Sequence, residues 1–240
     1  MRAPIWVRAT AFVCLFAVTS CGGGGGGGSD PFIPVPPLQP GAGSTNFAAP
    51  DYASQWEIGP IIDGDNSSKG VPLHPSPHAE GISIDIPYPN KDAGHVHYVT
   101  FRHGSLAGKN RIVMEYKFEA AEGVKLVPTN FPSHPALLSL YFQRRGDDWT
   151  SVGYRWFSVQ HNSFQPTDVL AGERRLAVAF TEPWQSIKSS WTNQSSPGMF
   201  DTARNETDRV GFVLGGGDGL GHGVYASGPA KLIITRFMVE

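Results

Sequence analysis

Cysteine is nearly absent from this 240-residue chain. Only two cysteines occur, Cys14 and Cys21, and both lie close to the N-terminus. No disulfide can therefore form within the remainder of the chain, and no thiol nucleophile is available there. A folded domain in this part of the chain has to be stabilised by its apolar core.

A strong excess of charge of either sign is also missing. The chain has 19 Lys and Arg against 21 Asp and Glu, and its formal net charge is −2. Without Arg2 and Arg8, which lie in an N-terminal leader, 17 basic residues stand against 21 acidic ones. Because nucleic-acid binding favours a basic surface, we expect no nucleic-acid partner.

Motifs that would identify a catalytic centre are missing too. There is no G-x-S-x-G for a serine hydrolase and no H-E-x-x-H for a zinc protease. His95 and His97 alternate onto one side of a strand-like segment, but a catalytic zinc needs a third protein ligand, which the sequence does not select. Glycosidases need two carboxylates at a set separation, and no pair is singled out here.

Long apolar runs are absent, and the N-terminal one is short. Residues 9–18 are apolar over about ten residues, too few to span a bilayer as a mature helix. Arg2 and Arg8 precede this run and Thr19 and Ser20 follow it, which is the layout of an export signal. The tetrad Val-Thr-Ser-Cys that ends at Cys21 resembles the lipobox of bacterial lipoproteins. The resemblance implies a signal at residues 1–20 and lipidation of Cys21, and the alternative is an ordinary signal peptide.

The segment after Cys21 is typical of a tether. Seven glycines run from Gly22 to Gly28, and a Pro-rich stretch continues to residue 45. Such sequences form flexible or extended chain and cannot bury a core. We therefore expect residues 21–45 to join a lipid anchor to a domain of residues 46–240. Gly22 stands where some lipoproteins carry Asp, so the resemblance implies an exported, lipid-anchored protein of the cell envelope, at the outer membrane.

The folded part reads as a series of short strands. The segment GISIDIP (residues 81–87) alternates isoleucine with polar residues, and HVHYVTFR (residues 95–102) places Val96 and Tyr98 on one side. Eight to eleven such runs are separated by Gly, Pro, Asn and Asp, and no helical period is sustained. These patterns predict an all-β, antiparallel jelly-roll sandwich with one short helix over residues 198–208.

A Gly-rich stretch, GGGDGLGHG, lies between two of these strand-like runs at residues 215–223. A phosphate-binding loop needs a helix N-terminus behind it, and the residues that follow here are strand-like. A calcium-binding repeat would need several copies. We therefore expect a loop between strands, with Asp218 and His222 as candidate ligand contacts on its rim.

Five segments in order carry a resemblance to a known group of folds. They are WEIGPIIDGDNSSKG, LSLYFQRRGDDWTSVGYRWFSV, PWQSIKSSW, RVGFVLGGG and GHGVYASGPAKLIITRFMV. Over residues 50–240 this order resembles the jelly-roll, galactose-binding-like sandwiches that include many carbohydrate-binding modules. Such modules often hold a structural calcium, which the resemblance implies here for the oxygen ligands Asp63, Asp65 and Asn66. The alternative is an Asp- and Asn-rich turn.

Three tryptophans lie in polar segments, where a core position is less expected. Trp149 belongs to GDDWT, and Trp184 and Trp191 belong to EPWQSIKSSWTNQSS. Sugar rings stack on flat aromatic faces, so these residues are candidate contacts for a glycan. The alternative is that each tryptophan covers an open end of the sandwich.

One strand-like segment offers a polar face that includes an aromatic residue. LLSLYFQRR places Tyr141, Gln143 and Arg145 opposite its apolar side chains. The next segment, YRWFSV, leaves two alternatives open: either Arg155 is paired inside, or Trp156 lies on the polar face. We count all five residues as candidate ligand contacts, and the alternative is that the arginines only pair with nearby acids.

Together these patterns predict an exported, membrane-tethered domain that binds a glycan or polysaccharide without catalysis. A polysaccharide hydrolase or lyase is the second hypothesis. The third is a structural or adhesive surface lipoprotein that binds a protein partner.

Overall fold

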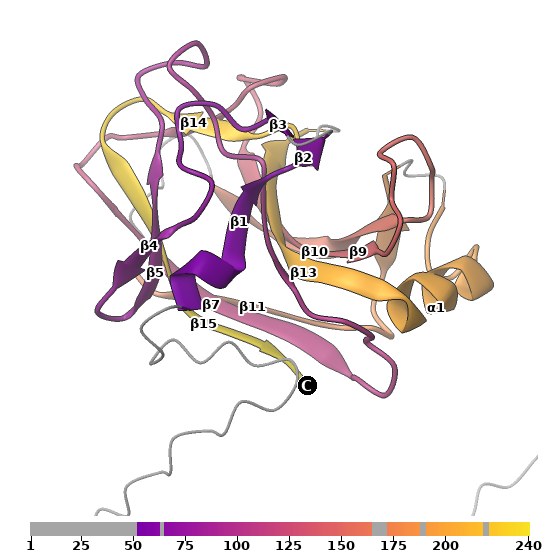
Figure 1. Cartoon of the computed structure of the whole chain (residues 1–240). Helices are drawn as coiled ribbons and strands as arrows, with labels where there is room; N and C mark the ends of the chain where they lie inside the picture. The colour runs from indigo at the N-terminus through magenta and orange to yellow at the C-terminus, as the bar shows by residue number, and fades with distance from the viewer. Residues whose placement is uncertain (1–51, 63–64, 165–171, 188–190, 218–220) are drawn as a thin grey trace, which may run out of the picture. The chain divides into compact units, whose positions relative to one another are not determined.

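The computed structural model describes residues 52–62, 65–164, 172–187, 191–217 and 221–240 (Figure 1). The chain divides into two compact units, Met1–Pro37 and Leu38–Glu240, and every described residue belongs to the second. The predicted signal, Cys21 and the tether lie outside the described residues. Asp63 and Asp218 also lie outside them, so the proposals for these positions remain predictions.

Two antiparallel sheets make up most of the described structure. The first sheet has six strands in the order β1, β6, β13, β9, β10 and β12, and the second has five in the order β11, β7, β15, β5 and β4. The bounds in the first sheet are Trp56–Gly59 (β1), Tyr98–Arg102 (β6), Thr207–Gly216 (β13), Ala136–Arg144 (β9), Arg155–Phe164 (β10) and Trp184–Ser186 (β12). In the second they are Arg174–Ala179 (β11), Arg111–Ala120 (β7), Ala230–Val239 (β15), Gly81–Ile86 (β5) and Ser76–His78 (β4).

Two short ladders and a 3-10 turn complete these elements. Strand β14 (Val224–Ala226) pairs with β8 (Leu126–Pro128), and β2 (Ile61–Ile62) pairs with β3 (Asp65–Asn66). The 3-10 turn covers Tyr52–Gln55.

The chain passes repeatedly from one sheet to the other. Strand β5 lies in the five-stranded sheet, β6 in the six-stranded sheet and β7 again in the five-stranded one. Such crossings between two antiparallel sheets are typical of jelly-roll sandwiches. The predicted all-β antiparallel sandwich is therefore confirmed.

The main core lies between the two sheets and is rich in aromatic side chains. Trp56 of the six-stranded sheet meets Phe237 of the five-stranded sheet edge to face, with ring centroids 5.2 Å apart. Leu140 and Phe142 of β9 belong to the same core, as the alternation of that strand predicted. This burial of apolar surface is the main stabilising contribution in a domain without disulfides.

The prediction that Val96 and Tyr98 share one face is wrong. Val96 lies in the main core with Val99, whereas Tyr98 lies on the opposite side of the six-stranded sheet. The reason is that strand β6 begins only at Tyr98, and Val96 before it forms an isolated bridge with Val224. The alternation of side chains therefore restarts at Tyr98.

One α-helix, α1 (Pro197–Asn205), leads into β13 (Figure 1). The prediction placed it at residues 198–208. It begins earlier because proline fits the first helical turn, where its missing N–H has no partner to lose. It ends earlier because β13 starts at Thr207. Within the described residues, no helix has the length and apolar character needed to cross a membrane.

Candidate functional site

Two of the predicted ligand contacts are core residues. Trp156 and Trp184 are 0% exposed and belong to the core between the sheets. Their indole N–H groups donate to backbone carbonyl oxygens, of Gly153 at 2.8 Å and of Ala179 at 2.9 Å. This corrects the prediction, because a fully buried indole cannot stack on an external sugar. Strand β12 starts at Trp184 and directs it inward, although the surrounding sequence is polar.

Three other candidates lie outside the main cluster of predicted residues. Trp191 is half-buried, and its carbonyl oxygen accepts a hydrogen bond from Ser186. Arg145 is exposed in the turn after β9. His222 is exposed and lines a separate hollow with His95 and His97.

Four of the predicted residues meet on the outer face of the six-stranded sheet. Tyr141 of β9 packs there with Tyr98, Phe157 and Val213, and Trp149 packs against this cluster. Gln143 and Arg155 flank the cluster on neighbouring strands β9 and β10, where their backbones are paired. The strand alternation that buries Leu140 and Phe142 on one side thus brings Tyr141, Gln143 and Arg155 to the other side, where the turn after β9 adds Trp149.

A buried ion pair organises this face. The Arg155 Nε atom lies 3.0 Å from Asp147 Oδ2, and the two side chains are 5% and 1% exposed. The Nε–H is not aligned as a hydrogen bond, so the contact is primarily electrostatic. Gln143 donates to the same carboxylate oxygen at 2.8 Å. Of the two alternatives left by the sequence, the structure shows the paired Arg155, with Trp156 in the core.

The carboxyl group of Asp147 is held in a desolvated environment. Burial raises the pKa of Asp147, whereas Arg155, the Trp149 N–H and Gln143 act in the opposite direction. Burial also raises the pKa of Tyr98 to about 12, against a smaller opposing effect of Arg155. At neutral pH the Tyr98 hydroxyl therefore remains protonated and can both donate and accept a hydrogen bond.

Trp149 has an unusual backbone conformation. Its φ is 65°, and among the described residues it is the one non-glycine with a positive φ. Asp147 Oδ1 accepts the Trp149 N–H at 3.0 Å, and the Arg155 guanidinium donates to the Trp149 carbonyl at 2.8 Å. The same guanidinium lies 4.8 Å from the indole centroid, a cation–π contact. The ion pair therefore holds both the backbone and the ring of Trp149.

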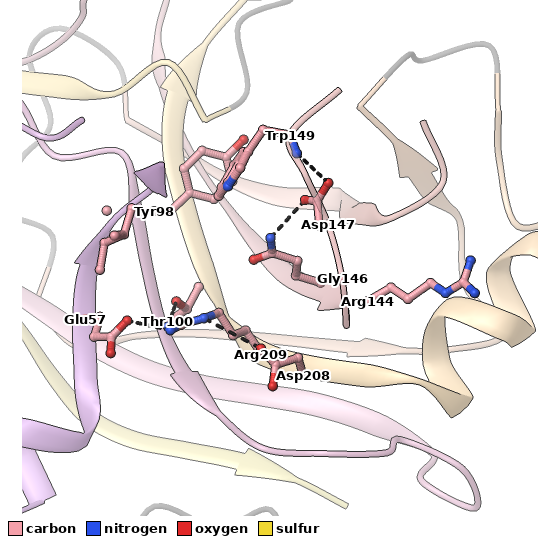
Figure 2. Close-up of a pocket in the computed structure, with 12 residues that line it drawn as sticks. Glu57, Tyr98, Thr100, Arg144, Gly146, Asp147, Trp149, Asp208 and Arg209 are labelled. Carbon is pink, nitrogen blue, oxygen red and sulfur yellow. Dashed lines mark hydrogen bonds and ion pairs between the residues drawn. The ribbon is translucent and has the colours of Figure 1, made fainter. Parts of the chain in front are cut away.

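Beside Trp149 lies a cavity of about 160 Å³, which we call the Trp149 pocket (Figure 2). It opens between strands β1, β6, β9 and β13 and the turn after β9. Its lining combines apolar groups, three carboxylates and two arginines. The lining residues are Glu57, Gly59, Ile61, Tyr98, Thr100, Gln143, Arg144, Gly146, Asp147, Trp149, Asp208 and Arg209.

Paired charges form the wall opposite Trp149. Figure 2 shows Arg209 between Glu57 and Asp208, and its NH2 group lies 2.6 Å from Glu57 Oε2. Asp208 also pairs with Arg102 at 3.0 Å. Arg144 points away from the pocket, consistent with its ion pair to Glu206 (Figure 2). The carboxylates of this wall therefore present oxygen atoms whose charge is largely balanced.

The Gly-rich segment borders this pocket on the side of Tyr98. Gly221 has a φ of 76°, and a Cβ atom at this position would lie 2.5 Å from the Tyr98 hydroxyl oxygen. Only glycine permits both this conformation and this close approach. Gly215 and Gly216 end strand β13, and residues 221–223 lead directly into β14, so the stretch lies between two strands as predicted; residues 218–220 lie outside the described residues.

The metal predictions gain no support from the described residues. No group of three or more His, Cys, Asp or Glu side chains among them is arranged to hold a metal ion. Asp65 is exposed in β3, the side chain of Asn66 is not described, and Asp63 lies outside the described residues. The calcium site therefore stays a prediction.

Sequence reasoning missed several residues of the Trp149 pocket. Glu57, Tyr98 and Arg209 come from three strands that are far apart in sequence, and no local motif links them. Asp147 is one of several carboxylates in the chain, and the sequence alone does not show which of them is buried. Tyr98 could have been assigned to the outer face if the strand had been taken to begin at Tyr98, because Val99 next to it is an apolar core residue. The alternation was instead counted from His95, which placed Tyr98 on the same side as Val96.

A scan against protein-family models finds no match for this chain, and a search of curated proteins finds none either. The β-sandwich is established by the structure. The finer resemblance to galactose-binding-like modules stays a prediction.

Proposed function

We propose that this protein is a carbohydrate-binding domain that holds one sugar residue of a glycan in the Trp149 pocket. The observation that carries the proposal is the conformation of Trp149. A tryptophan at φ 65° is strained, and the buried Asp147–Arg155 pair holds it there with its ring partly exposed. Such strain persists only where the surroundings enforce it, and it clusters at binding and active sites.

The groups around the pocket fit a sugar. An indole face offers an apolar surface for pyranose C–H groups, and Tyr98 packs edge to face against it at 5.4 Å. Gln143, Thr100 and Glu57 offer fixed donors and acceptors for hydroxyl groups. The cavity of about 160 Å³ is smaller than the roughly 300–1,000 Å³ of pockets for drug-sized ligands. It suits one sugar unit of a chain rather than an entire oligosaccharide.

The charge balance of the pocket favours an uncharged ligand. Asp147 pairs with Arg155, Glu57 with Arg209 and Asp208 with Arg102. A neutral sugar can hydrogen-bond to such paired groups without leaving a buried charge uncompensated.

The protonation state of Tyr98 also fits a binding site better than a catalytic one. A tyrosine with a pKa of about 12 is a poor general base near neutral pH. One observation favours the alternative of a polysaccharide hydrolase or lyase: burial raises the pKa of Asp147, as in carboxyl groups that act as general acids. Any ligand found should therefore also be examined for released products.

The test is a glycan and polysaccharide panel probed with the chain from residue 22 onward. We expect saturable binding that Trp149→Ala weakens about tenfold or more, because it removes the stacking surface. Trp191→Ala is the matched control, since it removes a half-buried indole that does not line the pocket. Trp149→Gly separates binding from folding, because glycine relieves the positive φ while it also removes the ring.

Three results would decide against the proposal. They are equal binding by the Trp149 and Trp191 variants, release of sugars from a bound polysaccharide, and no binding to any glycan. Release of sugars would support the hydrolase or lyase, and no binding would direct the search to a protein partner.

We also propose that the domain is exported and anchored through a lipid on Cys21. The lipobox-like tetrad and the Gly- and Pro-rich segment after it support this location. A membrane-bound glycan receptor at the outer membrane would combine the two proposals.

A further inference from the structure

We infer a second ligand site, for an anionic group, in the hollow where His95, His97 and His222 meet Lys69 and Lys91. We call it the histidine hollow; its volume is about 350 Å³, and Asp92, Thr129 and Asn130 complete its described lining. The anionic groups that fit are a carboxylate, a sulfate or a phosphate. This inference does not depend on the Trp149 pocket.

Backbone pairing brings the hollow together from distant segments. Lys69 and His95 face each other in an isolated bridge, in which the His95 N–H donates to the Lys69 carbonyl at 2.9 Å. Val96 pairs with Val224 in the same way, and this places the end of the Gly-rich segment beside His97. Thr129 donates from its hydroxyl to the His222 carbonyl and thereby ties the hollow to the segment after β8.

The two central imidazoles are closely packed. The rings of His95 and His97 stack with centroids 4.3 Å apart. Gly223, with a φ of 88°, lies so close that a Cβ there would be 2.2 Å from His97 Cδ2. His97 Nε2 is buried and has no hydrogen-bond partner among the described residues. Buried polar atoms are normally satisfied, so this nitrogen points to a missing group.

The charges of the hollow favour an anion. Two lysines face one described carboxylate, that of Asp92, whereas the Trp149 pocket balances its acids with arginines. Burial, with His95 and His222 adding to it, lowers the pKa of His97 to about 3. The buried ring is therefore neutral near pH 7 and can supply an N–H donor, while the lysines supply positive charge.

A metal ion suits the hollow less well. The two imidazole planes are stacked at an interplanar angle of 17°, and no set of described His, Cys, Asp or Glu side chains converges as metal ligands. Anion recognition needs donors and positive charge instead, and the described lining provides both.

Sulfate is the best probe because its charge stays constant between pH 5 and pH 8. We expect saturable NMR shifts at residues 95–97 and 222–223 when sulfate is added to the chain from residue 22 onward. Sulfate should bind more tightly as the pH falls, because a bound anion favours the protonated form of His95, whose pKa burial otherwise lowers.

The double variant Lys69→Gln/Lys91→Gln should weaken sulfate binding about tenfold or more, because it removes the charged donors. Lys125→Gln is the control, since Lys125 is exposed and does not line the hollow. Separate titrations with glucuronate and with inorganic phosphate distinguish an acidic sugar from a phosphate ester. Trp149→Ala should leave these titrations unchanged, so this inference can fail independently of the proposed function.

Three outcomes would overturn the inference. The first is the absence of saturable binding of all three anions, and the second is equal binding by the double variant and the control. The third is tight zinc binding at the same histidines without sulfate binding, which would show a metal site instead.

Discussion

At the scale of single residues, Asp147 connects stability to the proposed binding site. Its carboxylate contacts Arg155, Gln143 and the N–H of Trp149 at once. A side chain that is 1% exposed cannot exchange these partners for water. The Trp149 pocket and the folding of the β9–β10 turn should therefore respond together to changes at this position.

Asp147→Asn tests this connection. Removing one partner of a buried ion pair leaves the other charge uncompensated and costs about 3–5 kcal/mol of unfolding free energy. The measurement is urea-induced unfolding at pH 7. Asp148→Asn is the control, because Asp148 is exposed and its Oδ1 atom accepts hydrogen bonds from the N–H groups of Thr150 and Ser151. Similar losses in both variants would show that the buried pair has no special role.

His97 predicts a pH dependence of stability. Its pKa is about 3 in the folded chain, mainly because of burial, and 6.5 is the ordinary value. Between these values the unfolded chain binds the proton and the folded chain does not, so stability falls as the pH falls from about 6.5 toward 3. His97→Asn should flatten the decrease in unfolding free energy between pH 7 and pH 5, measured without added anions. An unchanged slope, equal to that of His134→Asn at an exposed position, would contradict this.

At the scale of elements, the Gly-rich segment adjoins both sites. Gly221 approaches Tyr98 of the Trp149 pocket, and Gly223 approaches His97 of the histidine hollow. Because Tyr98 and His97 are consecutive in the chain, one loop and one strand end connect the two sites. A change in this loop can therefore affect either site without any change in the two sheets.

Gly221→Ala should weaken both the fold and glycan binding. The added methyl group would lie 2.5 Å from the Tyr98 hydroxyl oxygen, and it would also be strained at a φ of 76°. Gly108→Ala is a close control, because its φ is 72° and no atom lies within 4 Å of the added Cβ. Both variants should lose about 1 kcal/mol through the backbone, and Gly221→Ala should lose more through the contact. Thermal unfolding and the glycan assay measure the two effects, and equal behaviour would show that the contact does not matter.

At the scale of the whole molecule, the chain combines an N-terminal segment outside the described residues and a sandwich without cysteine. The absence of thiols after Cys21 means that folding of residues 38–240 does not depend on the redox state of the compartment. The aromatic core between the sheets provides the stability that disulfides supply in many exported domains.

Lipidation of Cys21 is a prediction at this scale. When the full chain is expressed in a bacterium supplied with a labelled fatty acid, the label should enter the protein and be lost in Cys21→Ser. Cys14→Ser should keep the label, because Cys14 lies within the predicted signal. An unlabelled wild-type protein, or loss of the label in Cys14→Ser, would contradict the lipoprotein interpretation.

Alternation within single strands was enough to predict the sandwich and part of the site. The β9 segment placed Tyr141 and Gln143 opposite Leu140 and Phe142, and the structure agrees. Alternation has a period of two residues and is local, so it can be read without knowledge of the partner strands. For the segment of Arg155 and Trp156 the same pattern left two alternatives open. Either Arg155 is paired inside or Trp156 lies on the polar face, and the sequence did not decide between them.

What only the tertiary structure decided is which residues meet across strands. Trp184 lies in a polar stretch of sequence, yet its ring packs on Phe142 of a distant strand. Glu57 and Arg209 come together because β1 and β13 both pair with β6, a fact that no local pattern contains. The sequence by itself therefore determined the fold class and the two faces of strand β9, whereas the faces of β6 and β10 were settled only by the structure. The composition of the Trp149 pocket and of the histidine hollow was decided by strand order and register, because these depend on packing of the entire core.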